Sequence, residues 1–432
     1  MKFCNIIFKR SKQIFIILFF TSITTCFYAQ NASISPYSRF GIGELQTVQN
    51  PRNVAMGGLG VGLTEAKSIS STNPASYLNL DSLSVMFEVN FQGIYSQLSE
   101  KQADATVGAR TNRASLGQIA LTFPITSWLK SSFGLLPGSN MSYSVTREYS
   151  VDTIGRYMLE NSGNGGLNQV FLGLSAGTSR IAFGVNVNYN FGSFVRNSVW
   201  QYVDTILSNP TSTHYLKSLD ARGVSFDFGL QYRQPLSKNY QLGLGLSYTP
   251  KAKLKASKNN ELYSVTTSSN TVPIDIKTIE NGTLELPDRY TAGLSFEKLN
   301  RWVIGVEYTG LNYSNYREFS EADQNLSDAY TIRTGMELKG QHLDNQFMNR
   351  LSYRVGYHYG TNYVTFGNSE IKEFGVSFGI GMPIRRSNSR VDVGVEFGRK
   401  GRVANGQIQE NYGRIVIGIS AFDRWFIRGK FD

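Results

Sequence analysis

Cysteine and histidine are both scarce in this chain, and their positions exclude several classes of protein. The two cysteines, Cys4 and Cys26, lie within the first 30 residues. The three histidines, His214, His342 and His358, are far apart and have no metal-ligand spacing. A serine hydrolase needs a histidine beside its nucleophile, and His214 and His342 fall in predicted connections. We therefore expect no enzyme, no metal site and no cofactor.

Long apolar runs are also missing, apart from one at the start of the chain. Basic residues precede a short apolar segment from Ile14 to Phe20. This arrangement predicts a signal peptide over residues 1–30, because the segment is too short to span a membrane as a helix. The alternative, a lipidated Cys26, lacks the leucine and small residue that usually precede such a cysteine.

From about Leu83 onward, apolar side chains alternate with small or polar ones, as in a strand with two different faces. The clearest example has apolar or aromatic residues at every second position from Ile181 to Phe191, with small residues and asparagines between them. Aromatic residues often end such segments, as in the interfacial girdles of transmembrane barrels. The pattern predicts an all-β chain rather than a helical membrane protein.

The lengths of the connections favour a membrane barrel over a soluble sandwich. Very short links alternate with long polar segments, which we expect to be loops at residues 153–168, 197–221 and 251–283. Short turns on one side and long loops on the other are typical of outer-membrane barrels. Fourteen strand segments alternate in this way. We therefore predict a 14-stranded antiparallel transmembrane β-barrel over residues 81–421, with residues 422–432 as a periplasmic tail or an extension of the last strand.

Inward-facing positions of these strands carry many glycines and serines, which leave room for a further segment inside the barrel. Charged residues on the same face predict a network of ion pairs and hydrogen bonds, because buried charges need partners. Direct contact with a ligand is the alternative. The predicted lumen network comprises Asp227, Arg233, Glu307, Arg333, Glu337, Arg354, Asp392 and Glu396.

Residues 31–80 precede the first strand and lack its alternation. The segment is rich in Gly, Ala, Ser and Asn, and we expect it to form an N-terminal hatch of short helices that plugs the lumen. Asn73 and Pro74 predict a helix start within this hatch. Asn73 can cap free backbone amides, and Pro74 costs no hydrogen bond in a first helical turn.

Several short motifs are spread over nearly the whole mature chain. They are Met56-Gly57-Gly58, Asn73-Pro74-Ala75, Leu135-Leu136-Pro137-Gly138, Leu286-Pro287-Asp288-Arg289 with Phe296 and Trp302–Tyr308, and Tyr353-Arg354-Val355-Gly356-Tyr357. In order and spacing, this set resembles the FadL/TodX-type family of outer-membrane channels for hydrophobic compounds, in the form common among Bacteroidetes. The resemblance implies a location in the cell outer membrane and a barrel blocked by an N-terminal hatch.

The resemblance also implies passive uptake of hydrophobic small molecules, such as long-chain fatty acids or aromatic hydrocarbons. These molecules would leave sideways through an opening in the wall. The hatch residues expected to contact the ligand are Asn73, Pro74, Ala75 and Tyr77. The residues expected at the lateral opening are Gly134, Leu136, Pro137 and Gly138. Pro137 cannot donate a ladder hydrogen bond, which favours a kink at this point. The kink is compatible with a lateral opening and with an ordinary strand end.

A second hypothesis is an interaction protein. Some barrels of this shape in Bacteroidetes look like shuttles or scaffolds for the type IX secretion apparatus, and the largely polar long segments suit such a role. The signal peptide takes four of 43 basic residues, which leaves 39 against 32 acidic ones and a net charge of +7. Export argues against nucleic acid as a partner. We expect a monomer that contacts a hydrophobic ligand, outer-membrane lipid and lipopolysaccharide.

Overall fold

The computed structural model describes residues 35–46, 50–64, 68–102, 105–152, 155–202, 211–266, 271–341, 344–366, 369–384, 387–404 and 406–425. The predicted signal peptide, residues 31–34 of the predicted hatch, His342 and residues 426–432 lie outside the described residues. The described residues all belong to one compact unit, Ser33–Asp432. Within them, no helix combines the length and the hydrophobicity that a membrane crossing requires.

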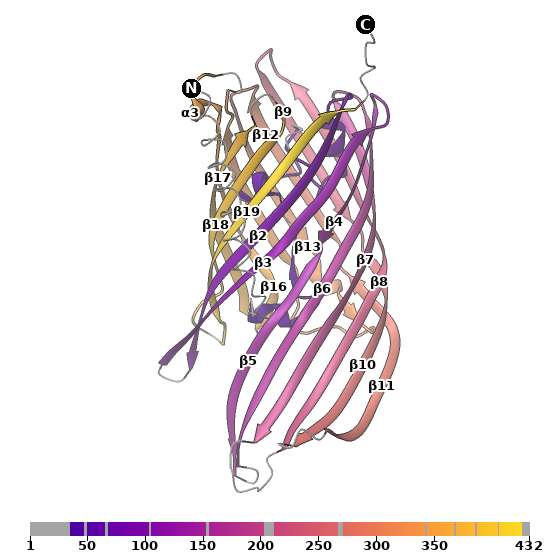
Figure 1. Cartoon of the computed structure of the whole chain (residues 1–432), viewed down its shortest axis with the longest axis vertical. Coiled ribbons are helices and arrows are strands. Elements are labelled where there is room, and N and C mark those ends of the chain that lie inside the picture. Colours follow the sequence, from indigo (N-terminus) through magenta and orange to yellow (C-terminus); the bar gives the residue numbers. More distant parts are fainter. Residues whose placement is uncertain are drawn as a thin grey trace, which may run out of the picture. The chain divides into compact units, whose positions relative to one another are not determined.

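Fourteen wall strands form a closed antiparallel barrel, because the last strand pairs with the first (Figure 1). Eleven of them are continuous: β2 (Ser84–Gln102), β3 (Ala105–Pro124), β6 (Gly155–Gly177), β7 (Ile181–Tyr202), β8 (Thr211–Pro235), β13 (Trp302–Leu311), β15 (Ala329–Leu338), β16 (Ser352–Phe366), β17 (Ser369–Pro383), β18 (Arg390–Lys400) and β19 (Gln409–Arg424). The other three are interrupted and carry two labels each: β4 (Leu129–Pro137) with β5 (Ser139–Val151), β9 (Tyr240–Thr249) with β10 (Ala252–Thr266), and β12 (Arg289–Lys298) with β11 (Thr271–Leu286). The predicted fold is confirmed.

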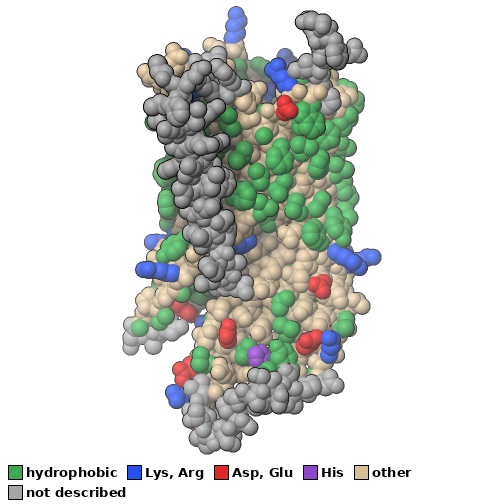
Figure 2. Space-filling model, viewed as in Figure 1, with side chains coloured by type: hydrophobic (Ala, Val, Ile, Leu, Met, Phe, Trp, Pro, Cys, Tyr) green, Lys and Arg blue, Asp and Glu red, His purple; other side chains and the backbone are tan. Residues whose placement is uncertain are grey.

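The alternation of side chains along each strand places apolar groups outside and polar groups inside. In β7, Phe183 and Tyr189 are exposed on the outer face, whereas Asn186 and Asn188 are each 1% exposed and face the interior. Hydrophobic side chains gather in a band on the visible face, above a region with more polar and charged groups (Figure 2). An apolar outer band over a closed sheet is the arrangement that a bilayer requires. The chain is a β-barrel of the outer membrane.

Both ends of the barrel, at Ser84 and Arg424, lie on the side with the short turns, which is the periplasmic side in such barrels. The last strand, β19, takes in residues 422–424 of the segment that was predicted as a tail or a strand extension. The short helix α3 (Phe347–Arg350) lies in the turn between β15 and β16, on the same side.

The three long polar segments are not loops, and this prediction was wrong. Most of their residues extend β6, β7, β8, β10 and β11, which project with β5 as a ribbon on the side away from the C-terminus (Figure 1). Cross-strand ion pairs support the ribbon, for example Lys258–Glu280 at 2.7 Å. Both faces of a strand outside the membrane meet water, so its sequence loses the apolar alternation and looks like a loop.

The N-terminal hatch lies inside the barrel and consists of short elements. These are η1 (Pro36–Arg39), β1 (Glu44–Leu45), α2 (Pro51–Val54) and η2 (Pro74–Asn79). The predicted helix start is present as a 3-10 helix, because the Asn73 side chain accepts a hydrogen bond from the Ala75 amide at 3.1 Å and Pro74 opens the first turn. A second cap follows the same rule, since Asn50 caps Arg52 and Pro51 opens α2.

Three apolar clusters fill the space between the hatch and the wall. The largest lies in the extracellular half and joins hatch residues such as Tyr37 and Ile42 to the connection between β13 and β15. That connection contains η3 (Tyr313–Asn315) and β14 (Arg317–Glu318), and it contributes the buried rings of Tyr313 and Tyr316. The interior is therefore a packed core and not an open tube.

Candidate functional site: the hatch and the wall break

The barrel wall is interrupted at Gly138, between β4 and β5. The ladder between β3 and β4 runs from Pro124↔Lys130 to Ile119↔Leu135 and ends there. β5 pairs with β6 and with hatch strand β1, and no ladder joins it to β3 among the described residues. β3 and β5 diverge below this point in Figure 1. We call this interruption the wall break. It lies at the residues for which a lateral opening is predicted, and the opening itself stays a prediction.

Local sequence explains the position of the wall break. Pro137 has no N–H to offer a ladder, and Gly138 follows it. On β6, Gly165 pairs with Met141 near the start of β5, and Gly165 and Gly166 have φ values of +127° and +154°, which only glycine adopts readily. The Gly138 amide donates to the Leu167 carbonyl at 2.8 Å, so β6 stays attached while the other edge is released.

The beginning of the hatch covers the edge of β5 that β3 leaves free. Glu44 and Leu45 pair with Asn140 and Ser139. The Gln46 amide donates to the Gly138 carbonyl at 3.0 Å. Hatch strand β1 therefore stands in the place of a wall strand over these residues.

An apolar cluster connects the wall break to the second half of the hatch. Its buried members are Ile69, Tyr77, Leu80, Met86, Ala120, Leu136 and Phe171. The rings of Tyr77 and Phe171 stack at 6.4 Å between centroids. Gly134 makes room for this packing, because a Cβ there would lie 2.8 Å from the Phe171 ring. The structure thus brings Leu136 of the predicted opening and Tyr77 of the hatch into one cluster, which we call the Leu136 cluster.

Asn73, Pro74 and Ala75 pack against wall glycines rather than lining a cavity. A Cβ at Gly229 would lie 2.1 Å from the Asn73 side-chain oxygen, and one at Gly184 would lie 2.2 Å from the Ala75 amide nitrogen. Asn73 also donates to the Val61 carbonyl at 3.0 Å. In this arrangement the three residues hold the hatch to the wall, and their predicted contact with a ligand stays a prediction.

One buried ion-pair network joins α2 to three wall strands. Glu337 pairs with Arg52 of the hatch at 2.6 Å and with Arg354 at 2.9 Å. Arg354 continues to Asp392 at 2.7 Å, and Arg390 reaches the same carboxylate at 2.6 Å. The arginines and carboxylates alternate along this chain, so each charge has an opposite neighbour.

The remaining predicted lumen residues fall into two groups. Glu307 and Arg233 bind the hatch backbone: Glu307 accepts from the Val61 amide at 2.9 Å, and Arg233 donates to the Thr64 carbonyl at 2.8 Å. Three others bind wall groups. Asp227 accepts from Asn188, Arg333 donates to Thr309, and Glu396 accepts from Tyr412.

Arg52, Glu88 and Lys400 are among the hatch anchors that the sequence interpretation missed. Arg52 lies in the hatch, where no strand pattern marks it as inward-facing. Glu88 of β2 accepts from the Ile69 amide at 3.0 Å and also binds Asn50. Lys400 binds Glu44 next to the wall break. Lys400 continues the inward-facing alternation of Asp392 and Glu396 to the end of β18.

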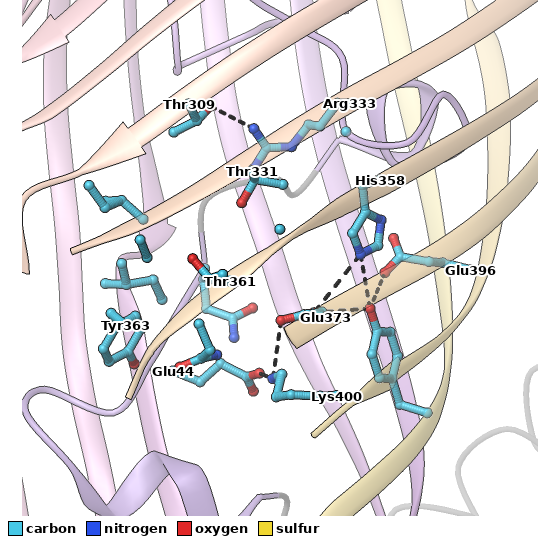
Figure 3. A pocket seen from close by; sticks show the side chains of 18 of the residues that line it. Glu44, Thr309, Thr331, Arg333, His358, Thr361, Tyr363, Glu373, Glu396 and Lys400 are labelled. Atoms are coloured by element: carbon cyan, nitrogen blue, oxygen red, sulfur yellow. Dashed lines mark hydrogen bonds and ion pairs between the residues drawn. The ribbon is translucent and has the colours of Figure 1, made fainter. Parts of the chain in front are cut away.

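A polar cavity of about 190 Å³ lies behind β1 (Figure 3). Figure 3 shows Glu44 and Lys400 together, with Glu373 between Lys400 and His358. The Tyr412 hydroxyl lies 3.1 Å from Glu373, 3.0 Å from Glu396 and 3.3 Å from His358. Such a lining suits water rather than an apolar solute. Among the described residues, no group of three or more metal-ligating side chains could hold a metal ion.

The pentapeptide Gly-x-Ser-x-Gly occurs twice, and both copies lie inside strands. Ser175 in β6 donates to the Ala75 carbonyl at 3.0 Å, and Ser377 in β17 accepts from the Gly57 amide at 2.8 Å. A hydrolase nucleophile of this pattern sits on a sharp turn between a strand and a helix. Both serines instead hold the hatch to the wall.

The fold and the hatch can now be set beside known proteins. The model of the family described as BamG matches residues 11–432. The chain belongs to the BamG family. No curated protein matches the chain.

Solved structures share the fold at low sequence identity. The toluene transporter TodX of Pseudomonas putida is 16% identical, with a TM-score of 0.59 over 89% of this chain and 100% of that one. The CymD monoaromatic hydrocarbon channel is 12% identical, with a TM-score of 0.58 over 88% of this chain and 99% of the other. A FadL homologue of Pseudomonas aeruginosa is 13% identical, with a TM-score of 0.57 over 88% and 99%. The resemblance to FadL/TodX-type barrels is thereby confirmed at the level of the fold.

Proposed function

We propose that this barrel mediates passive uptake of hydrophobic small molecules, which leave sideways through the wall break. The wall break beside Pro137, in contact with the apolar Leu136 cluster, is the observation that carries the proposal. A lipid-like solute gains about 0.8 kcal/mol for each CH₂ group that stays out of water. A route along apolar side chains preserves that gain, whereas the polar cavity behind β1 does not.

In this proposal the structure corresponds to the closed state of the route. Leu136, Phe171 and Tyr77 fill the path between the wall break and the hatch. Passage requires these side chains to move apart and β1 to leave the edge of β5. The Arg52–Glu337 ion pair lies elsewhere on the hatch, so α2 can stay anchored while the segment around Glu44 breaks its pair with Lys400 and moves.

The solved structures with this fold are described as channels or transporters for toluene and other monoaromatic hydrocarbons, or as a FadL homologue. These descriptions support a hydrophobic ligand for this chain, either long-chain fatty acids or aromatic hydrocarbons. They also support the expectation that the chain is not an enzyme. The strands of the extracellular ribbon carry mostly polar residues, which do not favour initial capture of an apolar ligand.

The proposal is tested by uptake of labelled oleate and of labelled toluene in cells with and without the protein. Leu136→Asn places a polar group of similar size beside the wall break and should lower both rates. Leu59→Asn is the matched control, since Leu59 is also buried, in an apolar cluster of the hatch away from the wall break. Equal uptake with and without the protein for these and other apolar solutes would refute the transport proposal.

A second candidate function is a binding platform for other proteins of the envelope. The extracellular ribbon favours it, because Ile276 and Ile279 of β11 are 55% and 63% exposed at a ribbon edge. Components of the type IX secretion apparatus are the partners that this proposal names. Affinity purification in native detergent should recover them, and their absence from such a preparation would count against this function.

A further inference from the structure

The outer face of the wall contains an apolar groove of about 550 Å³ that the uptake route does not use. It crosses five adjacent strands, β12, β13, β15, β16 and β17. Its lining comprises Leu294, Phe296, Ile304, Gly305, Val306, Thr334, Gly335, Met336, Val355, Gly356, Tyr357 and Val376. Two of these lining side chains, Thr334 and Tyr357, carry a hydroxyl group.

Pairing register explains the depth of the groove. Val306, Thr334, Tyr357 and Val376 are neighbours across four strands. Val306 and Thr334 are both short, β-branched side chains and lie beside the long Tyr357 ring, so the row is low at β13 and β15. The row nearer the periplasm contains Ile304, Met336 and Val355, which form the groove's second side.

The inner face of the same strands is pressed against the hatch backbone. Gly305, Gly335 and Gly356 are cross-strand partners. A Cβ at Gly335 would lie 2.4 Å from the Met56 carbonyl oxygen, and one at Gly356 would lie 2.0 Å from the Gly57 amide nitrogen. The wall has no inner side chains here and touches the hatch main chain directly. The groove is therefore built into the barrel at the point where the hatch docks.

The depth at which the groove lies in the membrane indicates which molecule can bind there. Ile304 and Val306 follow Trp302, the first residue of β13 at the periplasmic rim, by two and four positions. At about 3.3 Å per residue, the groove lies within roughly 13 Å of that rim, in the periplasmic half of a hydrocarbon layer about 30 Å thick. This leaflet presents acyl chains to the wall. A groove left empty would lose dispersion contacts on one side.

Basic residues at the periplasmic rim indicate the charge of the bound lipid. Lys298 ends β12 directly below the groove, and Arg301 lies in the following turn, where it is exposed. The Lys298 ammonium lies 5.6 Å from the centre of the Tyr240 ring. Two cations beside the apolar groove complement an anionic phosphate at the head-group level.

We propose that this groove binds one acyl chain of an anionic phospholipid from the periplasmic leaflet, with the lipid phosphate held by Lys298 and Arg301. The site is separate from the uptake route, since it lies on the outer face at β12–β17 and the wall break lies between β3 and β5. Binding depends on packing in the groove and on charge at the rim.

Native mass spectrometry tests the proposal. Purified protein is reconstituted in vesicles of equal parts phosphatidylethanolamine and phosphatidylglycerol, extracted in mild detergent, and its retained lipids are counted. The wild type should retain phosphatidylglycerol preferentially. Lys298→Gln with Arg301→Gln should reduce that preference at least about tenfold. Thr334→Phe should reduce retention of both lipids by filling the groove.

Ile417→Phe is the control for the groove variant, because Ile417 is exposed on the outer face of β19 away from the groove. Heat-modifiable migration on gels confirms that each variant forms a barrel. Equal lipid retention in Thr334→Phe and Ile417→Phe would overturn the proposal. So would an unchanged lipid preference in the rim variant. Loss of a co-purified protein from Thr334→Phe, with lipid retention intact, would instead assign the groove to a protein partner.

Discussion

Replacing Glu337 with glutamine removes the carboxylate that joins the hatch to the wall. Glu337 is fully buried and pairs with Arg52 at 2.6 Å and with Arg354 at 2.9 Å. Arg354 keeps Asp392 in the variant, but the Arg52 guanidinium loses its ion pair with Glu337 inside the barrel. Removing one partner of a buried, hydrogen-bonded ion pair destabilises its segment by about 3–5 kcal/mol.

The expected consequence is easier opening of α2. Because about 1.36 kcal/mol corresponds to a factor of ten, the open population should rise by roughly 10² to 10⁴. A glutamine carbonyl still accepts a hydrogen bond, which favours the lower end of this range. The wall strands keep their own ladders, so the barrel should remain closed and the effect should be local to the hatch.

Cysteine labelling measures this opening directly. Both native cysteines lie in the predicted signal peptide, and Val54 of α2 is 0% exposed. A maleimide should modify Val54→Cys only when α2 leaves the wall. In the Glu337→Gln background the labelling rate should rise about 100-fold, and in Arg52→Met it should rise less, because Glu337 then keeps Arg354.

The matched control is Glu148→Gln, which breaks an exposed pair with Arg156 at 3.5 Å on the ribbon. An exposed pair contributes at most about 1 kcal/mol, so labelling of Val54→Cys should be unchanged. If Glu337→Gln labels no faster than Glu148→Gln, the buried network does not anchor the hatch and the reasoning fails.

Three further predictions concern packing and charge. Gly356→Ala should lower the free energy of unfolding by about 1–3 kcal/mol, because its Cβ would meet the Gly57 amide. Gly413→Ala, whose nearest atoms lie at 3.6 Å, should leave stability unchanged, and equal melting temperatures of the two variants would contradict the docking contact. Phe171→Ala should lower the free energy of unfolding by about 3–5 kcal/mol, because it opens a cavity. It should also raise toluene flux into vesicles several-fold, and an unchanged flux would place the route elsewhere. Glu280→Gln should change stability by less than about 1 kcal/mol in urea at low salt, and a larger loss would show that the Lys258 pair is more than a surface contact.

The barrel was predictable because the membrane imposes a contrast on every strand. From Ile181 to Phe191 the outer residues face lipid and the inner ones face the hatch, so the sequence alternates and the strand count follows. Above the membrane this contrast ends. Over residues 197–202 and 212–218 no side chain is fully buried on either face, and nothing in their pattern separates a paired strand from a loop.

Parts of the candidate site could be located from residues whose own chemistry indicates a role. Pro137 and Gly138 indicate a ladder break without reference to the rest of the fold, and a break is found there. Inward charges such as Glu337 and Arg354 indicate that a network exists. Their partners in the hatch were not predictable, because the hatch has no periodic pattern and its path through the lumen depends on contacts such as that of Arg52.

A reversible cross-link between the hatch and β5 tests the central proposal most directly. Leu45 and Ser139 are ladder partners at the wall break, and Leu45→Cys with Ser139→Cys can join them by a disulfide. Phe87→Cys with Ala421→Cys joins ladder partners of β2 and β19 and serves as the control pair. Lateral passage predicts that the oxidised hatch pair stops flux of oleate and toluene into vesicles, that reduction restores it, and that the control pair has no effect. Full flux through the oxidised hatch pair would contradict a route through the wall break.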